Sequence, residues 1–340
     1  MLILNEKDMK RTVLDANRET SENILSCASG YNKVMDTVEE AYRIFHSGDF
    51  YMPHRPTITH GANTLLYMPC FKPDGFGTKF LTVFPDNPAR GHPYIDGLML
   101  LNDGSSGKTT AILDAAYLTA LRTGAAGGVG IRHFSRNDCK SAGIIGAGKQ
   151  GFFLAVYAST ARNISDIYIY ESAPKNLDDY VNRLGQELGP KPPKIHICSS
   201  AKQLLENSEI VITATPAVSP VVPNDPGLLR GKCFVAIGSY KPQMRELPNA
   251  IWELVDNVYT ELPYALEESG DFTQPLADGL LKTDQVVYIG EWLSRKDRPI
   301  PKQGQTTFFK SVGMGLLDLC VAQLIYSTAK QSGIGQEVEF

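Results

Sequence analysis

The stretch SAGIIGAGKQGFFLAVYAST at residues 141–160 places a Gly-rich turn between an apolar run and a helix-forming run. Gly146, Gly148 and Gly151 form the pattern GxGxxG, which indicates a dinucleotide site when it follows a strand and opens a helix. The first glycine permits a tight turn, the second lets backbone N–H groups approach a pyrophosphate, and the third lets the helix pack closely on the strand. We therefore expect a dinucleotide here; a Gly-rich turn without a ligand is the alternative.

Glu171 ends the next expected strand, DIYIYE, twenty residues beyond the third glycine. A carboxylate at this place can accept hydrogen bonds from both ribose hydroxyls, and it repels the 2′-phosphate of NADP. Lys175 is the only cation nearby, so NAD is favoured and NADP remains possible. A later strand, IVITATP, ends at the carboxyl edge where the ligand crevice of such a sheet lies, although a plain strand end explains its residues equally well. The expected cofactor-binding residues are Gly146, Gly148, Lys149, Gln150, Gly151, Glu171, Thr213, Ala214 and Thr215.

Strands and helical stretches alternate from Ser141 onward. This alternation is typical of βαβ units and predicts a Rossmann-type, doubly wound parallel sheet in an α/β domain. Residues 50–101 hold short apolar runs broken by Pro, Gly and Asp, which is the pattern of a sheet with hairpin connections. Helices are expected over residues 34–45, 109–127, 149–161, 176–188 and 307–332.

The last of these helices follows the final strand signals, so it can return to the N-terminal part of the chain. We therefore expect two domains, in keeping with a usual domain size of about 100 to 200 residues. Residues 1–120 with 305–340 would form an α+β substrate-binding and dimerisation domain completed by the C-terminal helix. Residues 121–304 would form the Rossmann dinucleotide-binding domain.

The composition describes a folded protein whose partners are small molecules or copies of itself. Hydrophobic residues make up 43% and charged residues 21% of the 340, and the formal net charge is -4. Neither disorder nor a basic surface for nucleic acid or anionic membrane fits these values. The six cysteines lack a CxxC pair, so they are interpreted as reduced core thiols and no metal is expected. Charges begin after four residues, and no long apolar stretch follows, so a cytoplasmic location is expected.

Three cations in the N-terminal half stand in apolar or Gly-rich surroundings: Arg55 in YMPHRP, Lys79 in GTKFLTV and Arg122 in LTALRTGAAG. A solvated surface cation is the alternative for each. Lys79 precedes an apolar stretch that should be partly buried, and a buried cation needs an anionic partner. The carboxylate of a substrate, held by two guanidinium groups beside an ammonium, would supply that partner.

The sequence resembles the ornithine cyclodeaminase/mu-crystallin family. The resemblance rests on MPHRP, MPCF, GTKF, AILDAAYLTALRTGAA, GIIGAGKQG, ITATPAVSPVV, AIGSYKPQMREL and TTFFKSVGMGLLDL, which run in order over nearly the whole chain. It implies a two-domain, dimeric protein with a nicotinamide cofactor. Known members include ornithine cyclodeaminases, alanine and arginine dehydrogenases, and ketimine or pyrroline-2-carboxylate reductases.

By this resemblance, Arg55, Lys79 and Arg122 match the family's substrate-carboxylate residues, with Lys79 also near the reacting carbon. Met68, Tyr240 and Gly313 fall in the motifs that line the substrate pocket. Asp318 either reaches this pocket or lies on the surface of the C-terminal helix, and we favour the helix surface.

Two departures from the cyclodeaminase pattern concern the substrate amine. Tyr240 stands where cyclodeaminases have an aspartate before xPxxxEL, and Leu66 stands where a glutamate is expected before the MP pair. Without these carboxylates, a cationic ω-amino group has lost both its anchors, which disfavours ornithine cyclisation.

The favoured function is an NAD(P)-dependent oxidoreductase acting at the α-carbon of an amino acid, imino acid or cyclic ketimine. In this hypothesis the arginines hold the carboxylate, and Lys79 stabilises charge or moves a proton. One alternative is ornithine cyclodeaminase, which forms proline and ammonia with catalytic NAD. The other is a non-catalytic ligand-binding protein of the mu-crystallin kind.

Overall fold

The computed structural model describes residues 1–14, 25–173 and 176–339, with side chains from residue 29 onward in the second range. The chain divides into two compact units. Unit 1 comprises Met1–Arg122 with Met314–Phe340, and unit 2 comprises Thr123–Gly313. Residues 305–313, which the sequence assigned to the first domain, therefore lie in unit 2.

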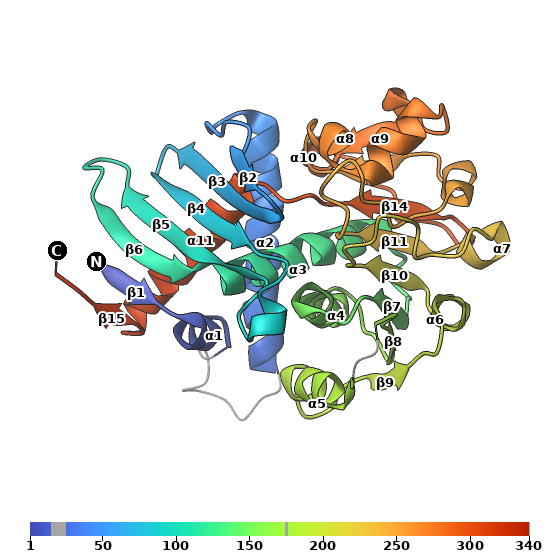
Figure 1. The fold of residues 1–340 in the computed structure, drawn as a ribbon, viewed down its shortest axis with the longest axis horizontal. Helices are drawn as coiled ribbons and strands as arrows, with labels where there is room; N and C mark the ends of the chain where they lie inside the picture. The colour runs from blue at the N-terminus through green and yellow to red at the C-terminus, as the bar shows by residue number, and fades with distance from the viewer. Residues whose placement is uncertain (15–24, 174–175, 340) are drawn as a thin grey trace. The chain divides into compact units, whose positions relative to one another are not determined.

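Unit 1 is built on a seven-stranded mixed sheet, whose strands are labelled in Figure 1. The order across the sheet is β15-β1-β6-β5-β4-β3-β2. Strands β2 to β6 form an antiparallel meander, of which the hairpin pattern in residues 50–101 predicts β2 to β5, whereas β1 pairs parallel to β6. The strands are β1 (Leu2–Leu4), β2 (Thr57–His60), β3 (Asn63–Lys72), β4 (Gly75–Val83), β5 (Ile95–Asp103), β6 (Thr109–Asp114) and β15 (Gln336–Glu337).

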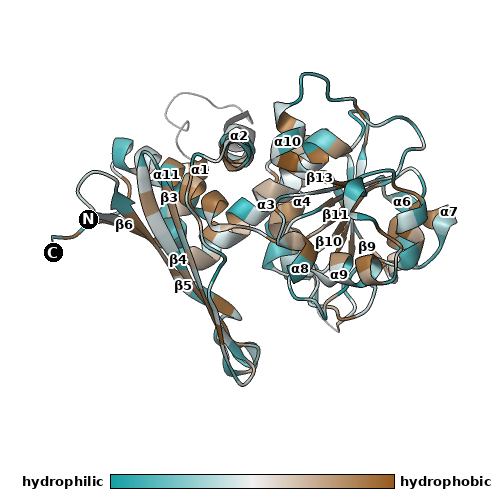
Figure 2. Ribbon diagram, turned by 90° about the horizontal axis from the view of Figure 1, so that it is seen from above, coloured by the Kyte–Doolittle hydropathy of each residue, from teal (hydrophilic) through white to brown (hydrophobic). Residues whose placement is uncertain are grey.

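Helices cover one face of this sheet. Figure 2 shows α11 against the sheet with α1 and α2 beyond it, and no described helix of unit 1 lies on the other face. Helix α11 packs on β3, β4 and β5, so the C-terminal helix does return to the N-terminal sheet. The helices are α1 (Glu6–Leu14), α2 (Leu25–Ser47), the start of α3 (Ala115–Phe134), α11 (Gly315–Gln331) and the short 3₁₀ turn η1 (Pro88–Arg90).

Strand register separates an inner face from an outer face. Lys79 lies in one cross-strand row with Met68 and Met99, and all three are buried beneath the helices on what we call the inner face. The adjacent row points the other way because side chains alternate along a strand. It contains Tyr67 and Leu98, which are exposed on the outer face. Strand pairing thus places Lys79 on the buried face.

Unit 2 contains an eight-stranded, fully parallel sheet in the order β13-β12-β14-β11-β10-β7-β8-β9. The order reverses between β7 and β10, which is where a doubly wound sheet binds its ligand. The strands are β7 (Ser141–Ile145), β8 (Asp166–Tyr170), β9 (Lys194–Ile197), β10 (Ile210–Thr213), β11 (Cys233–Ala236), β12 (Val258–Thr260), β13 (Val286–Tyr288) and β14 (Thr307–Lys310). The helices are α4 (Lys149–Ala161), α5 (Asp178–Glu187), α6 (Ala201–Asn207), α7 (Pro226–Leu229), α8 (Ala265–Glu268), α9 (Gly270–Ala277) and α10 (Ile289–Ser294), with 3₁₀ turns η2 (Asn249–Glu253) and η3 (Thr283–Gln285).

Two predicted helices begin too early. Residues 109–114 form strand β6, so the helix expected over 109–127 starts only at Ala115. Residues 307–310 form strand β14 between β11 and β12, so the helix expected from Thr307 starts only at Gly315. Both runs contain β-branched or aromatic residues, and each pairs with at least one strand distant in sequence: β6 with β1 as well as with the adjacent β5, and β14 with β11 and β12.

Close packing within unit 2 depends on small residues in α3. A Cβ on Gly124 would lie 2.6 Å from the Tyr157 ring of α4, and one on Gly130 would lie 2.3 Å from the Phe309 ring of β14. Both contacts are closer than a side chain tolerates. Small residues in α3 therefore permit this close packing.

The cysteine side chains in the described ranges are free and buried: Cys70, Cys139, Cys198, Cys233 and Cys320. Burial raises the pKa of Cys70 to about 12, so this thiol is unreactive near neutral pH. The Cys27 side chain lies outside the described residues. Within those residues, no helix is long and apolar enough to cross a membrane, and no cluster of three or more His, Cys, Asp or Glu side chains could hold a metal ion.

Candidate functional site

The Gly-rich turn connects β7 to α4 in unit 2. Gly146 has φ of +105°, and a Cβ there would lie 2.6 Å from the Ala214 carbonyl oxygen, at the reversal of strand order. A Cβ on Gly151 would lie 2.0 Å from the Gly146 carbonyl oxygen, so the helix rests directly on the turn. A Cβ on Gly148 meets no atom within 4 Å. The first and third glycines are required by the fold, and the second borders open space.

The residues around this turn fit a dinucleotide. Gly148 is the N-cap of α4 and no side chain caps the start of this 13-residue helix, where the backbone N–H groups and the helix dipole favour an anion. Lys149 is exposed in the first turn, and the buried Oε1 atom of Gln150 has no hydrogen-bond partner among the described residues. A pyrophosphate beside Gly148 would match the helix start and the Lys149 ammonium, whereas the Gln150 oxygen is an acceptor and needs a donor.

Glu171 lies directly after β8 and supports the Gly-rich turn. Its Oε2 accepts a hydrogen bond from the Ala147 N–H at 3.0 Å, and its Oε1 accepts one from the Ala173 N–H at 3.0 Å. The carboxylate therefore lies against the turn, where the ribose of a dinucleotide binds in this fold. Lys175, the cation weighed against NAD preference, lies outside the described residues.

The carboxyl end of β10 is fixed by a buried acid that sequence reasoning did not single out. Thr215 donates from its N–H (2.7 Å) and its hydroxyl (2.8 Å) to Oε1 of Glu246. Ala214 is half-buried, and the buried Thr213 hydroxyl has no partner among the described residues. Glu246 is the acid of the MREL segment. Its place in this family motif was the only feature of the sequence that could have pointed to its role.

Unit 1 brings Lys79 and Arg122 together on one carboxylate. Lys79 Nζ lies 2.8 Å and Arg122 Nε 2.9 Å from the same atom, Oδ1 of Asp318. Lys79 and Asp318 are fully buried, and Arg122 is 5% exposed. Lys79 also donates to the Thr119 hydroxyl at 3.1 Å. β4, α3 and α11 each supply part of this cluster.

Asp318 was expected on the helix surface, and that prediction is wrong. Helix α11 is buried on β3, β4 and β5, so the face carrying Asp318 points at the sheet. A close approach sets the start of this helix, because a Cβ on Gly315 would lie 3.3 Å from the Met68 carbonyl oxygen. The anionic partner that Lys79 needed is therefore part of the protein.

The cluster retains unused hydrogen-bonding capacity. A protonated Lys79 has a third N–H with no partner among the described residues, and the Asp318 Oδ2 atom is likewise unpartnered. Within the described part of the chain, Arg122 makes its only hydrogen bond through Nε. Its two terminal nitrogens can therefore bind another group. Two cations face one carboxylate, so the cluster can accept another anion.

Burial and the neighbouring cations set the protonation of Lys79. Burial, Arg122 and Arg55 lower the pKa of Lys79 from 10.5 to about 7, although Asp318 opposes the shift. Arg55, half-buried in the segment before β2, is therefore within electrostatic reach of Lys79. A lysine with a pKa near 7 can both give and take a proton at physiological pH.

The remaining predicted pocket residues divide between the two units. Met68 is buried beside Lys79 on the inner face, and Leu66 shares this face two residues earlier. Tyr240 is half-buried after β11 in unit 2, with the Lys241 ammonium 5.7 Å from its ring centroid. Gly313 has φ of +76°, and its N–H donates to Glu261 at 2.7 Å.

Comparison with known proteins identifies the family of this chain. A sequence model of the ornithine cyclodeaminase/mu-crystallin family matches residues 17–333. The chain belongs to this family. A relative, the Δ1-pyrroline-2-carboxylate reductase of Bacillus thuringiensis subsp. konkukian, is 32% identical over 282 residues, which cover 82% of this chain and 85% of that protein. The alanine dehydrogenase of Archaeoglobus fulgidus is 28% identical over 94% of this chain and 97% of its own.

A solved structure of the family has the same fold. The Δ1-pyrroline-2-carboxylate reductase of Thermococcus litoralis, in complex with NADH and L-proline, superposes with a TM-score of 0.87 and 29% identity. The match covers 99% of this chain and 100% of that one. The predicted family, the Rossmann-type α/β fold, the cofactor NAD and the class of NAD(P)-dependent oxidoreductase acting on amino or imino acids are confirmed.

Proposed function

We propose that this member of the family reduces the C=N bond of a cyclic imine carboxylate, of the Δ1-pyrroline-2-carboxylate class, with NADH. The cluster of Lys79, Arg122 and Asp318 carries this proposal, because it combines an anion site with a proton donor. The Bacillus and Thermococcus relatives, both named as reductases of this imine, support the choice of substrate.

The carboxylate of the substrate is assigned to Arg122 and Arg55. The terminal nitrogens of Arg122 can bind both carboxylate oxygens in a fork while Nε stays on Asp318. Two cations against one carboxylate in a buried cluster favour an anionic substrate. Met68 and Leu66 add apolar surface, which suits a ring without a charged group.

The proton is assigned to Lys79. An imine accepts hydride readily only when its nitrogen is protonated, and the unpartnered N–H of Lys79 can supply that proton. NADH, when bound, supplies the hydride to the ring carbon that carries the carboxylate. The C=N π bond is lost, one C–H and one N–H bond form, and an amino acid leaves. Asp318 and Thr119 orient the Lys79 ammonium throughout.

The dinucleotide is assigned to Gly146, Gly148, Lys149, Gln150 and Gly151, with Glu171 at the ribose and Thr213, Ala214 and Thr215 at the strand edge. Tyr240 and Gly313 are assigned to the substrate pocket. The 2′-phosphate of NADP would meet the Glu171 carboxylate, so NADH is the preferred cofactor.

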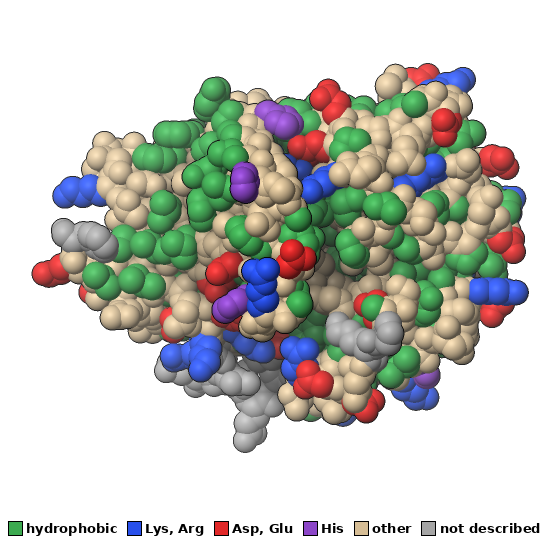
Figure 3. Space-filling view, viewed as in Figure 1, with side chains coloured by type: hydrophobic (Ala, Val, Ile, Leu, Met, Phe, Trp, Pro, Cys, Tyr) green, Lys and Arg blue, Asp and Glu red, His purple; other side chains and the backbone are tan. Residues whose placement is uncertain are grey.

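A homodimer is also proposed, through the outer face of the unit 1 sheet. Ile58, Tyr67, Phe71 and Leu98 are each at least 37% exposed there. Phe76 stacks on Phe71, and Phe80 packs edge-on against Tyr67, so the exposed surface is continuous and apolar. Figure 3 shows hydrophobic side chains gathered over this part of unit 1. Such a patch needs a partner, and a second copy is self-complementary across a twofold axis. Neither nucleic acid nor membrane is proposed as a partner, and the cytoplasmic location stays a prediction.

The experiment is a stoichiometric assay with a panel of substrates. NADH oxidation is followed by its absorbance with Δ1-pyrroline-2-carboxylate, a six-membered cyclic imine carboxylate, and pyruvate with ammonia. We expect one NADH oxidised per imine consumed, with the cyclic imines preferred. L-Ornithine with trace NAD is the decisive control: proline and ammonia released faster than any imine is reduced would show a cyclodeaminase instead.

A further inference from the structure

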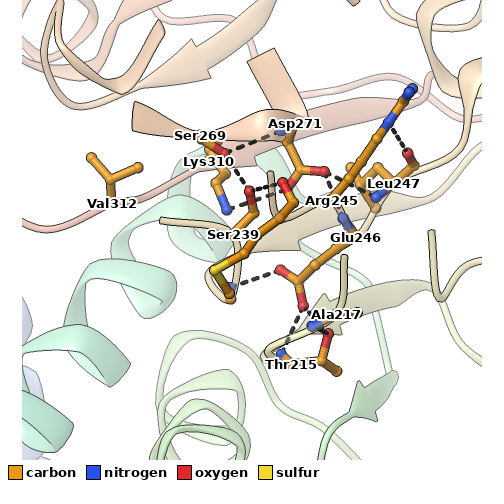
Figure 4. A network of polar contacts seen from close by, with 12 residues as sticks. Thr215, Ala217, Ser239, Arg245, Glu246, Leu247, Ser269, Asp271, Lys310 and Val312 are labelled. Atoms are coloured by element: carbon orange, nitrogen blue, oxygen red, sulfur yellow. Dashed lines mark hydrogen bonds and ion pairs between the residues drawn. The ribbon is translucent and has the colours of Figure 1, made fainter. Parts of the chain in front are cut away.

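A buried carboxylate joins the ends of two neighbouring strands in unit 2 (Figure 4). Glu246 is fully buried. Its Oε1 accepts both hydrogen bonds from Thr215 after β10, and its Oε2 accepts one from the Gly238 N–H after β11 at 2.7 Å. The two chain segments also touch, because a Cβ on Gly238 would lie 2.1 Å from the Thr215 carbonyl oxygen. Glu246 therefore fixes the spacing of this edge.

The segment that carries Tyr240 is anchored at both ends by the same network. Asp271 Oδ1 accepts hydrogen bonds from the N–H groups of Glu246 (2.8 Å) and Leu247 (3.0 Å). At the other end, the Ser239 hydroxyl donates to the Met244 carbonyl oxygen at 2.6 Å and lies 2.8 Å from the Ser269 hydroxyl. Displacing Glu246 would therefore move Thr215 and this segment together.

Lys310 supplies the positive charge within the network. It is fully buried at the end of β14, and its Nζ lies 3.3 Å from Asp271 Oδ2 at an angle unsuited to a hydrogen bond. Burial raises the pKa of Glu246 and Lys310 opposes this, while Asp271 adds to it. The neighbouring Arg245 side chain turns away to Leu247, Gln274 and Asn249.

We propose that Glu246 is a positioning residue for the dinucleotide-binding edge, and that Lys310, paired with Asp271 in the same buried network, supplies the positive charge that favours its carboxylate form. This rests on the proposed function only in assigning NADH to the Thr215 edge. Two of the donors to Glu246 are backbone N–H groups, which cannot become acceptors. An amide must place its NH2 group against the Thr215 N–H or the Gly238 N–H, and a protonated carboxyl has to donate to the Thr215 hydroxyl, so only the carboxylate accepts from all three donors.

The test measures NADH binding without substrate, by quenching of protein fluorescence, from about pH 6 to about pH 9, where an ordinary lysine stays charged. The variants are Glu246→Gln, Lys310→Met and the double variant. Lys232→Met is the matched control, because Lys232 precedes β11 at the opposite edge and binds the Ser208 carbonyl oxygen. Glu246→Gln leaves Lys310 and Asp271 balanced, so it is expected to fold.

We expect Glu246→Gln to raise the NADH dissociation constant by roughly ten- to a hundredfold, the weight of a hydrogen bond to a charged group. In Lys310→Met, affinity should fall as pH falls, because the loss of Lys310 removes the charge that opposes the raised pKa of Glu246. The double variant should be weak and independent of pH. Lys232→Met and the unmodified protein should change little with pH.

Unchanged NADH affinity in Glu246→Gln would overturn the proposal, as would a flat pH profile in folded Lys310→Met. If NADH affinity still depends on pH in the double variant, the group that takes up the proton is Asp271 and not Glu246, which would also overturn the proposal. If Lys310→Met does not accumulate as folded protein, the NADH affinity of Glu246→Gln decides alone. A weaker affinity supports the proposal, and an unchanged affinity overturns it. If the unmodified protein does not bind NADH, the proposed function is refuted instead. The fluorescence titration of the unmodified protein distinguishes this result from the others.

Discussion

Lys79 and Asp318 stand 239 positions apart in the sequence, yet their charged atoms lie 2.8 Å apart with both side chains fully buried. The pair couples a strand of the N-terminal sheet to the C-terminal helix. Since Asp318 opposes the lowering of the Lys79 pKa, it also sets the pH at which this lysine can act as an acid.

The first prediction concerns this pH. Imine reduction requires protonated Lys79, so kcat/KM should fall as pH rises through about 7. Asp318→Asn removes a charge that raises the Lys79 pKa, and the falling limb should move to lower pH. Because the substrate titrates in the same way with both proteins, a difference between the two pH profiles comes from the enzyme. Lys79→Met should abolish the activity, and with it the fall of kcat/KM at high pH. If this fall occurs at the same pH in Asp318→Asn as in the unmodified protein, Lys79 is not the proton donor.

The same substitution should also reduce stability. Asp318→Asn leaves two buried cations without a carboxylate, and breaking such a pair costs about 3 to 5 kcal/mol. Denaturant unfolding should show this loss as a lower midpoint with an unchanged slope. A loss below about 1 kcal/mol, as for an exposed ion pair, would mean that the cluster is hydrated.

Arg122→Leu tests the carboxylate site. The variant keeps Lys79 and Asp318 as a balanced pair, so it should fold. It should lose on the order of 2 to 5 kcal/mol of transition-state binding, measured as kcat/KM, while NADH affinity stays unchanged. Arg90→Leu, an exposed cation of the same unit, is the control. Near-normal kcat/KM in Arg122→Leu would give this residue a structural role only.

Glu171→Ser tests cofactor choice. Loss of the carboxylate removes repulsion of the 2′-phosphate, so the preference for NADH over NADPH in kcat/KM should narrow. Affinity for NADH should also fall, by roughly tenfold or more, because Glu171 supports the Gly-rich turn through Ala147. Ser172→Ala, at the exposed neighbouring position, should leave both unchanged. An unmodified protein that already prefers NADPH would refute the assignment of Glu171.

Leu98→Asp tests the dimer. A charge at the centre of the outer face should convert a dimer into monomers, as measured by light scattering after size-exclusion chromatography. Val218→Asp, which changes an equally apolar and more exposed residue in unit 2, should leave the dimer intact. Dimers that survive Leu98→Asp would place the interface elsewhere.

Local sequence patterns were sufficient for the Gly-rich turn of unit 2 and for the strand and helix that flank it. The three glycines, the strand before them and Glu171 lie within about thirty residues, and each role follows from backbone geometry that neighbouring residues determine. The meander of β2 to β5 was equally readable, because Pro, Gly and Asp break it at each turn.

Longer-range features were decided only by tertiary structure. The run TFFK became a strand because β11 and β12, both distant in sequence, pair with it, and TTAILD pairs with the distant β1 as well as with the adjacent β5. Asp318 was predicted to be a surface acid because the sequence does not show which face of its helix packs against the sheet. Packing of α11 on the sheet buried it against Lys79 and Arg122, and burial in turn lowered the Lys79 pKa. A charge's partner and its solvation are properties of three-dimensional neighbours, so the sequence could name the cations, and only the folded chain could supply their carboxylate.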